Sequence, residues 1–344
     1  QPQQPQQPQP QRQQHHYHRA ARRTRLPQQE GQQRKISRRS MMVAAATRGR
    51  RAASVLLGLA AAATAATTTS TPATRADYAE RLWEGSQAMA RRSAMHAFVV
   101  GLADGAGAVT AESYETYVAQ DAFFLHGFAQ AYAAALSKLP PGDLDGLKRF
   151  HGLISAVLEE LDLHLQVHPD LDLDSLEPLE ATTAYLDFLK GVAGDPARQV
   201  NEVLAAMAPC MRLYAEIGSL LARALPDATS ETNPFHSWVE QYAAEEFAAA
   251  AKEVDDLLDE YASLPGAASF EAMTELYNRA MELEFGFFDA QAVRGRGSPG
   301  ALSKVRRQMD EDWKSTTTEA GTQRAQARAK ARAKGTGKKG NGEL

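Results

Sequence analysis

The chain of 344 residues contains a single cysteine, which excludes an intramolecular disulfide framework and a zinc site built from cysteines. It also lacks a long hydrophobic run, because no apolar stretch reaches the roughly 18 residues that a membrane-spanning helix needs. Aromatic residues make up 7% of the chain and hydrophobic residues 44%, which is ordinary for a globular protein. The sequence therefore predicts a globular domain with no membrane partner.

Positive charge is scarce in the middle of the chain. Residues 1–76 carry 13 basic and 1 acidic residue, residues 77–313 carry 17 and 39, and residues 314–344 carry 8 and 2. Nucleic-acid binding needs clustered Lys and Arg that contact phosphates, so the acidic middle excludes nucleic acid as the main partner. Only the middle segment has the composition of a folded domain, and the two basic ends are predicted to be disordered extensions.

The leader, residues 1–76, has two parts. Residues 1–40 are mostly Gln, Pro, Arg and His, and the first methionines are Met41 and Met42, where we expect the natural product to start. From Met42 the chain is rich in Ala, Ser, Thr and Arg and has no acidic residue before Asp77. This composition favours a transit peptide for an organelle, a plastid rather than a mitochondrion.

Two other locations stay open. Arg50 and Arg51 precede the apolar run 52–66, a pattern that also occurs in secretory and twin-arginine signals. A cytoplasmic protein is the other alternative.

Between residues 77 and 313 no stretch alternates strictly between apolar and polar residues, as a half-buried strand would. Apolar residues recur instead every three or four positions, as in the stripes that contain Phe124 and Phe128, or Phe150 and Leu153. This spacing predicts an all-α fold, a compact bundle of seven or eight helices that are 20–25 residues long. Gly and Pro predict the breaks between them, at 102–107, 140–142, 169–178, 191–196, 226–234 and 264–268.

Several residues invite a chemical interpretation. A lone cysteine in a helix is by default a small buried hydrophobe, and this holds for Cys210 on the residues alone. Tyr214 follows four residues later and shares its helix face. Asp121 lies within an aromatic stripe, where an acid without a partner would be costly, so a ligand-binding role is favoured. Glu284 has a hydrophobic sequence setting that would raise its pKa, whereas Glu282 is expected to be exposed.

Nine histidines raise the question of a metal. His164 and His168 are four residues apart, a spacing that could bind a metal ion on a helix. No third ligand accompanies them at a recognisable spacing, and Pro169 follows directly. We therefore predict no metal and no cofactor.

Seven passages, in this order and at this spacing, resemble the TenA/thiaminase II family of aminopyrimidine hydrolases over nearly all of residues 78–292. The passages are HAFVVGLADG, SYETYVAQDAFFL, EELDLH, ATTAYLDFL, APCMRLYAEIG, WVEQYAAEEF and MELEFGFFDA. The resemblance implies the helical bundle shared with haem oxygenases, commonly a homotetramer. It also implies thiamin salvage, in which an aminomethyl pyrimidine or thiamin is hydrolysed to the hydroxymethyl pyrimidine.

The resemblance also implies roles for individual residues. Cys210 falls on the family's nucleophile, which places the chain in the cysteine-bearing branch, and Asp121 matches the residue that anchors the pyrimidine. Phe124 occupies a stacking position where some relatives have Tyr. The family's pocket tyrosines match Tyr185, Tyr214 and Tyr242.

The implied chemistry is covalent. A thiolate that adds to a ring carbon breaks the aromaticity and pushes electrons toward the exocyclic methylene, so that a poor leaving group can depart before water adds. A ring nitrogen must gain a proton as the thiolate adds, and we assign this acid to Glu284.

Two other functions remain open at this stage. The first is a catalytically silent helical protein that keeps the pyrimidine pocket. The second is an oxidoreductase of the related cofactor-biosynthesis branch, which would need a basic pocket for acidic quinones.

Overall fold

The computed structural model describes residues 77–168 and 170–312. Every regular element in these two ranges is a helix and none is a strand, so the predicted all-α fold is confirmed. The predicted leader, residues 1–76, and the predicted basic tail, residues 314–344, lie outside the described residues.

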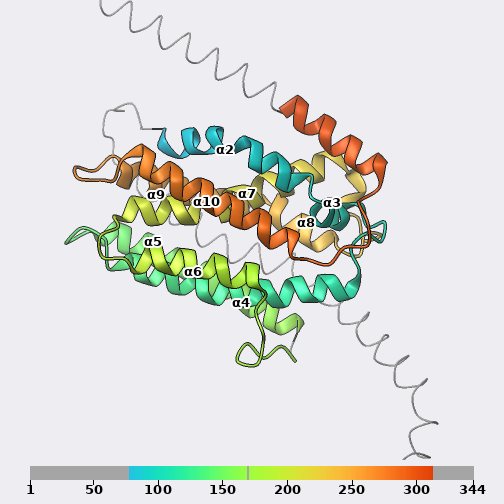
Figure 1. Cartoon of the computed structure of the whole chain (residues 1–344), viewed down its shortest axis with the longest axis horizontal. Coiled ribbons are helices and arrows are strands. Elements are labelled where there is room, and N and C mark those ends of the chain that lie inside the picture. The colour runs from blue at the N-terminus through green and yellow to red at the C-terminus, as the bar shows by residue number, and fades with distance from the viewer. Residues whose placement is uncertain (1–76, 169, 313–344) are drawn as a thin grey trace, which may run out of the picture. The chain divides into compact units, whose positions relative to one another are not determined.

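The helices differ in length, and the short helices α3 and α8 lie among longer ones (Figure 1). They are α2 (Tyr78–Ala94), α3 (Ala97–Asp104), α4 (Ala111–Leu136), α5 (Leu144–Val167), α6 (Glu180–Gly194), α7 (Val200–Ala224), the 3-10 turn η1 (Pro226–Thr229), α8 (His236–Ala243), α9 (Glu245–Ala262) and α10 (Phe270–Asp289). A further helical segment spans residues 299–312.

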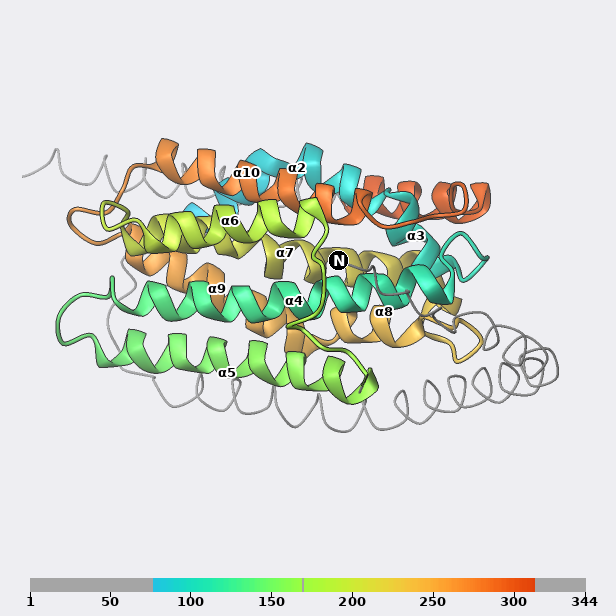
Figure 2. The same ribbon diagram turned by 60° about the horizontal axis from the view of Figure 1, so that its bottom comes forward.

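Helix α7 forms the centre of the bundle. It packs against α8, α9 and α10, while α4 packs against α5 and α6, and α2 lies along α10 (Figure 2). The side chains from Val203 to Ala208 in α7 are almost completely buried. A helix that is apolar all round belongs in the interior, which explains why the middle of the bundle forms around this segment.

Each predicted break coincides with an observed link between helices. Three observed links were not predicted: those before α3, between α8 and α9, and between α10 and the helical segment 299–312. Helix α3 begins after His96, whose Nδ1 accepts a hydrogen bond from the Phe98 amide (3.2 Å). Helix α9 begins after Ala244, which has an extended backbone. Neither of these two links contains Gly or Pro. The predicted helix length of 20–25 residues is wrong for α3 and α8, which have 8 residues each, and also for α2, α6 and α9, which have 17, 15 and 18.

Gly218 allows α7 to approach α8 closely. A Cβ atom at this position would collide with the Tyr242 carbonyl group and would lie 2.6 Å from the Ala243 nitrogen. Backbone atoms cannot swing away as a flexible side chain can. The absence of a side chain at Gly218 therefore sets the position of the α8 segment that carries Tyr242.

Replacing Gly218 with alanine should lower the free energy of unfolding by about 2–3 kcal/mol, because the overpacked contact forces two helices apart. Urea denaturation monitored by circular dichroism measures the effect. The matched control is Gly191→Ala in α6, where an added Cβ meets no atom within 4 Å. This change should stabilise the helix by up to about 1 kcal/mol. Equal stability changes in the two variants would contradict the close approach.

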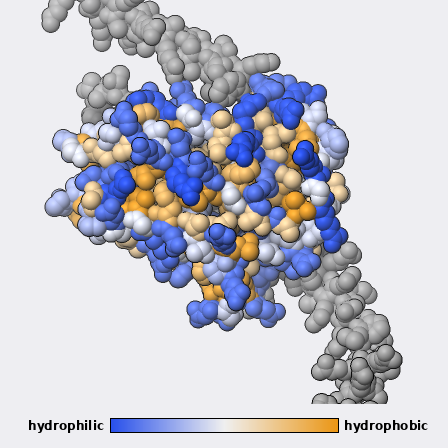
Figure 3. Space-filling view, in the orientation of Figure 1, coloured by the Kyte–Doolittle hydropathy of each residue, from blue (hydrophilic) through white to orange (hydrophobic). Residues whose placement is uncertain are grey.

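Among the described residues, no helix combines the length and the apolar character that crossing a bilayer requires. On the face drawn in Figure 3, hydrophilic residues surround smaller groups of apolar ones.

Candidate active site

A pocket opens among the helices of the bundle, with a volume of about 470 Å³ that includes some open solvent. It is lined from α4 by Asp121, Phe124, Leu125 and Phe128, from α5 by Val157 and Glu160, from α6 by Tyr185, from α7 by Cys210, Met211 and Tyr214, from α8 by Tyr242, from α9 by Phe247, and from α10 by Glu284 and Phe287. All seven residues that the sequence analysis singled out as site residues are among them. The structure thus brings together side chains that are up to 163 positions apart, from Asp121 to Glu284.

Helix α7 places Cys210 at the pocket wall. Pro209 lies inside this helix and has no amide hydrogen, so the helical hydrogen bond expected at that position is missing. Cys210 is partly buried, and Tyr214, one turn later, lines the same pocket. The expectation that these two side chains share a helix face agrees with the structure.

The Glu284 carboxyl group interacts with both the Cys210 thiol and the Tyr185 hydroxyl. The Tyr185 hydroxyl donates a hydrogen bond to Glu284 Oε1 (2.7 Å), and the Cys210 thiol interacts with the Glu284 carboxyl group in the same pocket. Burial raises the pKa of Glu284 to about 7, although its interactions with Tyr185 and Cys210 oppose this increase. Glu284 is thus able to exchange a proton near neutral pH, as a general acid or base must.

The pocket makes the Cys210 thiol a weaker acid than an ordinary cysteine. Burial raises the pKa of Cys210 well above its usual value, and the negative charges of Glu284 and Asp121 raise it further. A thiolate at this position therefore requires a proton acceptor or a positive charge nearby. Glu284, which lines the same pocket and interacts with the thiol, is the candidate acceptor.

A second polar group lies across the pocket and includes two residues that the sequence analysis missed. His164 Nε2 lies 2.8 Å from Asp121 Oδ2. Glu160 Oε1 accepts hydrogen bonds from Gln241 Nε2 (2.6 Å) and from the Tyr242 hydroxyl (3.4 Å). Burial and the Asp121 charge raise the pKa of Glu160 to about 7, and the nearby His164 partly offsets this.

Asp121, Glu160 and His164 each offer one donor atom, and these atoms lie within 4.8 Å of one another. A metal ion could be held by such a set. However, Asp121 and His164 are already hydrogen-bonded to each other and Glu160 to Gln241, so the groups partner one another without an ion. The group does not include His168, and the absence of a metal stays a prediction.

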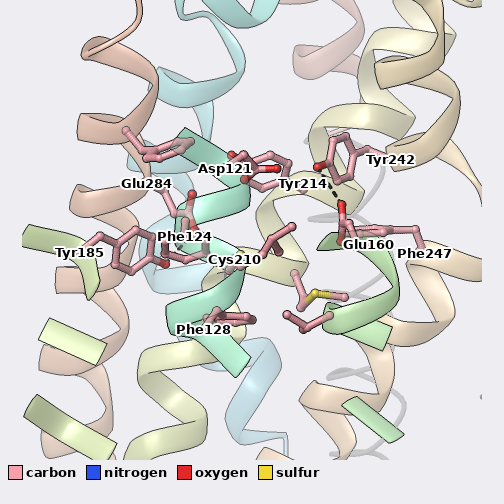
Figure 4. A pocket seen from close by; sticks show the side chains of 14 residues that line it. Asp121, Phe124, Phe128, Glu160, Tyr185, Cys210, Tyr214, Tyr242, Phe247 and Glu284 are labelled. Atoms are coloured by element: carbon pink, nitrogen blue, oxygen red, sulfur yellow. Dashed lines mark hydrogen bonds between the residues drawn. The ribbon is translucent and has the colours of Figure 1, made fainter. Parts of the chain in front are cut away.

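Aromatic rings surround the polar groups. Phe124 and Tyr185 have ring centroids 4.9 Å apart on the side of Glu284, and Tyr214 and Tyr242 have centroids 4.8 Å apart on the side of Glu160 (Figure 4). Three carboxyl groups and a thiol line the pocket, and none of its 14 lining residues, all in the described part of the chain, is Lys or Arg. An acidic pocket with aromatic walls favours a planar ligand that carries positive charge.

The missed residues left a weak signal in the sequence. Glu160 and His164 are four residues apart in EELDLH, which is the spacing of two side chains on one helix face. Their relation to Asp121, on another helix, depends on how α4 packs against α5.

Comparisons with known proteins agree with this geometry. The model of the TENA/THI-4/PQQC family matches residues 83–294. The bifunctional TH2 protein, mitochondrial, of Arabidopsis thaliana is 32% identical over 219 residues, which cover 57% of this chain and 34% of that protein. The chain thus spans about a third of the length of this plant relative. An aminopyrimidine aminohydrolase of Halalkalibacterium halodurans is 29% identical over 219 residues, covering 62% of this chain and 94% of that enzyme.

Solved structures share the fold. A TenA homologue from P. horikoshii OT3 superposes with a TM-score of 0.53 at 22% identity, covering 62% of this chain and 97% of that one. A TenA family transcription regulator from Silicibacter sp. gives a TM-score of 0.53 at 26% identity, covering 62% and 96%. The predicted resemblance is confirmed, and the chain belongs to the TENA/THI-4/PQQC family.

Proposed function

We propose that the protein is a hydrolase of thiamin-related aminopyrimidines that acts in thiamin salvage. It would cleave the C–N bond that joins the pyrimidine methylene to its leaving group, giving the hydroxymethyl pyrimidine. Family membership and relatives named aminopyrimidine aminohydrolase support this class of reaction. The observation that carries the proposal is that the Cys210 thiol and the Glu284 carboxyl group line one acidic aromatic pocket and interact there.

The pocket offers what an aminopyrimidine needs for binding. Its flat ring fits between aromatic walls that include Phe124 and Tyr214. The exocyclic amine donates to the Asp121 carboxylate, whose orientation is fixed by His164. A ring nitrogen on the opposite edge then faces Glu284.

The reaction begins when the Cys210 proton passes to Glu284. The thiolate adds to the ring carbon beside the substituted one, and Glu284 returns the proton to the adjacent ring nitrogen. Electrons from the ring then form an exocyclic double bond, while the C–N bond breaks and its electron pair leaves with the amine.

Water completes the turnover. It adds to the exocyclic methylene and loses a proton, which restores electrons to the ring. The C–S bond then breaks, the ring nitrogen returns its proton through Glu284, and the aromatic pyrimidine and the thiol are regenerated. The hydrogen bond from Tyr185 holds Glu284 in place throughout.

The two competing functions make different demands on the pocket. An oxidoreductase for acidic quinones would need basic side chains, and the lining residues include no Lys or Arg. A silent pyrimidine-binding protein would need the pocket but not the pairing of Cys210 with Glu284.

Incubating the full-length protein with the aminomethyl pyrimidine or with thiamin should release the hydroxymethyl pyrimidine, which chromatography detects. Turnover at about 1 s⁻¹ or faster is expected for an enzyme on its proper substrate. Tight binding of both compounds without product would favour the silent binding protein. Comparison of kcat/KM for the two compounds establishes the preferred substrate.

Assembly and location stay predictions. The homotetramer rests on family resemblance. Import into an organelle is supported by the composition of residues 42–76 and by the plant relative named mitochondrial. The preference for a plastid rests on composition alone.

A further inference from the structure

The geometry of an aminopyrimidine ring determines where its leaving group lies in the pocket. In an aminopyrimidine of this class, the nitrogen that gains a proton lies directly across the ring from the carbon that bears the exocyclic amine. The carbon with the methylene and leaving group is next to that amine-bearing carbon. A ring whose nitrogen faces Glu284 therefore turns its leaving group toward the opposite wall.

Glu160 and Tyr242 form that opposite wall. In Figure 4 Glu284 and Tyr185 lie at one side of the pocket, Glu160, Tyr242 and Phe247 at the other, and Cys210 between the two sides. The proposed reaction assigns no role to Glu160, although it is a carboxyl group at the pocket wall.

Glu160 is held in a defined orientation. Both of its hydrogen bonds within the described ranges, from Gln241 and from Tyr242, are made to Oε1. One carboxylate oxygen of Glu160 also lies within 4.8 Å of the Asp121 and His164 donor atoms, so the group points toward the part of the pocket where Asp121 would hold the exocyclic amine. Because Gln241 and Tyr242 both use Oε1, Oε2 can accept a hydrogen bond from a ligand.

We propose that Glu160 binds the protonated amine of the leaving group and thereby makes the pocket selective for an aminomethyl pyrimidine over thiamin. This inference rests on the proposed function. A primary alkylamine is protonated at neutral pH and offers three N–H donors, which suit a carboxylate. The thiazolium of thiamin also carries positive charge, but its ring nitrogen has no hydrogen to donate.

The proton balance of C–N cleavage is consistent with this role. The ammonium group already carries three hydrogens, so it departs as ammonia with the C–N electron pair and needs no proton from Glu160. Thiamin's leaving group departs as a neutral thiazole in the same way. Glu160 is thus a specificity-determining residue, and it favours a substrate whose amine stays protonated.

The test is Glu160→Gln in the full-length protein, assayed on both compounds. The amide keeps the size of the side chain but removes its charge. We expect kcat/KM for the aminomethyl pyrimidine to fall about 30- to 100-fold, the usual effect of a lost hydrogen bond to a charged group. The value for thiamin should change less than about 3-fold. The control is Glu159→Gln, an exposed position on the same helix, which should leave both values unchanged.

Equal losses on the two substrates would indicate a structural role and overturn the proposal. An unchanged preference in Glu160→Gln, or a wild-type protein that prefers thiamin, would overturn it as well.

A binding measurement tests the role of Glu160 independently of whether the protein is a hydrolase. In the Cys210→Ser background, which prevents turnover, calorimetry compares the aminomethyl pyrimidine with the uncharged hydroxymethyl pyrimidine. The aminomethyl compound should bind about 30-fold more tightly, and Glu160→Gln should abolish this difference. If the wild-type protein hydrolyses neither the aminomethyl pyrimidine nor thiamin, the hydrolase proposal is wrong. The ratio of the Kd values for the hydroxymethyl and aminomethyl pyrimidines then decides the role of Glu160 by itself. A ratio that Glu160→Gln does not alter overturns the inference.

Discussion

Replacing Cys210 with serine is expected to lower kcat on the aminomethyl pyrimidine by a factor of at least about 1000. Serine has nearly the same shape, so it should keep the position of the side chain beside Glu284. Its hydroxyl, however, is a much weaker acid and a poorer nucleophile than the thiol. The loss is measured at saturating substrate, with chromatography used to quantify the hydroxymethyl pyrimidine that is released.

Binding and folding serve as controls for this variant. The Kd for the hydroxymethyl pyrimidine and the melting temperature should both stay close to those of the wild type, because the cavity is unchanged. Cys210 is the only cysteine of the chain, so no other thiol can substitute for it. If Cys210→Ser retained a tenth or more of the wild-type kcat, the covalent route would be wrong.

Replacing Glu284 with glutamine should be nearly as severe for the reaction, with kcat reduced by a factor of about 100 to 10,000, because glutamine can neither accept the thiol proton nor donate one to the ring. Although it lowers kcat, the same change should increase the stability of the folded protein above neutral pH. The pKa of Glu284 in the folded protein is about 7, whereas the ordinary value is 4.5. The folded state therefore binds more protons than the unfolded state between these two values.

The sign of the effect follows from this difference. The stability associated with protonated Glu284 is fully present below pH 4.5 and is lost as the pH rises through about 7. Glutamine does not ionise, so Glu284→Gln avoids this loss. We expect the variant to be more stable than the wild type at pH 8, by up to about 3 kcal/mol, relative to their difference at pH 4.5.

Urea denaturation at pH 4.5, 6 and 8 measures this difference. The matched control is Glu282→Gln, two residues earlier on α10, where the side chain is 53% exposed and pairs with Arg279. Its effect on stability should be small at each pH. A Glu284→Gln variant that lost stability relative to the wild type as the pH rose would contradict a buried, protonated Glu284.

The sequence allowed most of the fold to be predicted, for identifiable physical reasons. Helical periodicity and the Gly and Pro breaks located the long helices, because each break removes a hydrogen bond or admits a backbone conformation that ends a helix. The starts of α3 and α9 were not predicted. They depend on the imidazole of His96 and on the extended backbone of Ala244, which leave no composition signal.

Prediction of the site depended on more than periodicity. Spacing along α7 predicted that Cys210 and Tyr214 share a face, but periodicity within one helix does not show which helices meet. Family resemblance supplied the long-range information that Asp121 and Glu284 belong beside Cys210. The structure places them around one pocket.

Glu160 and His164 were missed because their importance arises from tertiary packing. His164 is 43 residues from Asp121 along the chain, yet their side chains are hydrogen-bonded. From the sequence, His164 was considered only together with His168 on its own helix. A residue whose partner lies on a neighbouring helix cannot be recognised from local spacing.

The raised pKa of the Cys210 thiol also affects how easily the sulfur is oxidised. Peroxide and other electrophiles attack thiolates far faster than thiols, so the raised pKa slows oxidative damage to this sulfur. A cationic ligand would offset the surrounding negative charge and favour ionisation only while it is bound. The carboxylates that lower the nucleophilicity of Cys210 would thus also lower its rate of oxidation.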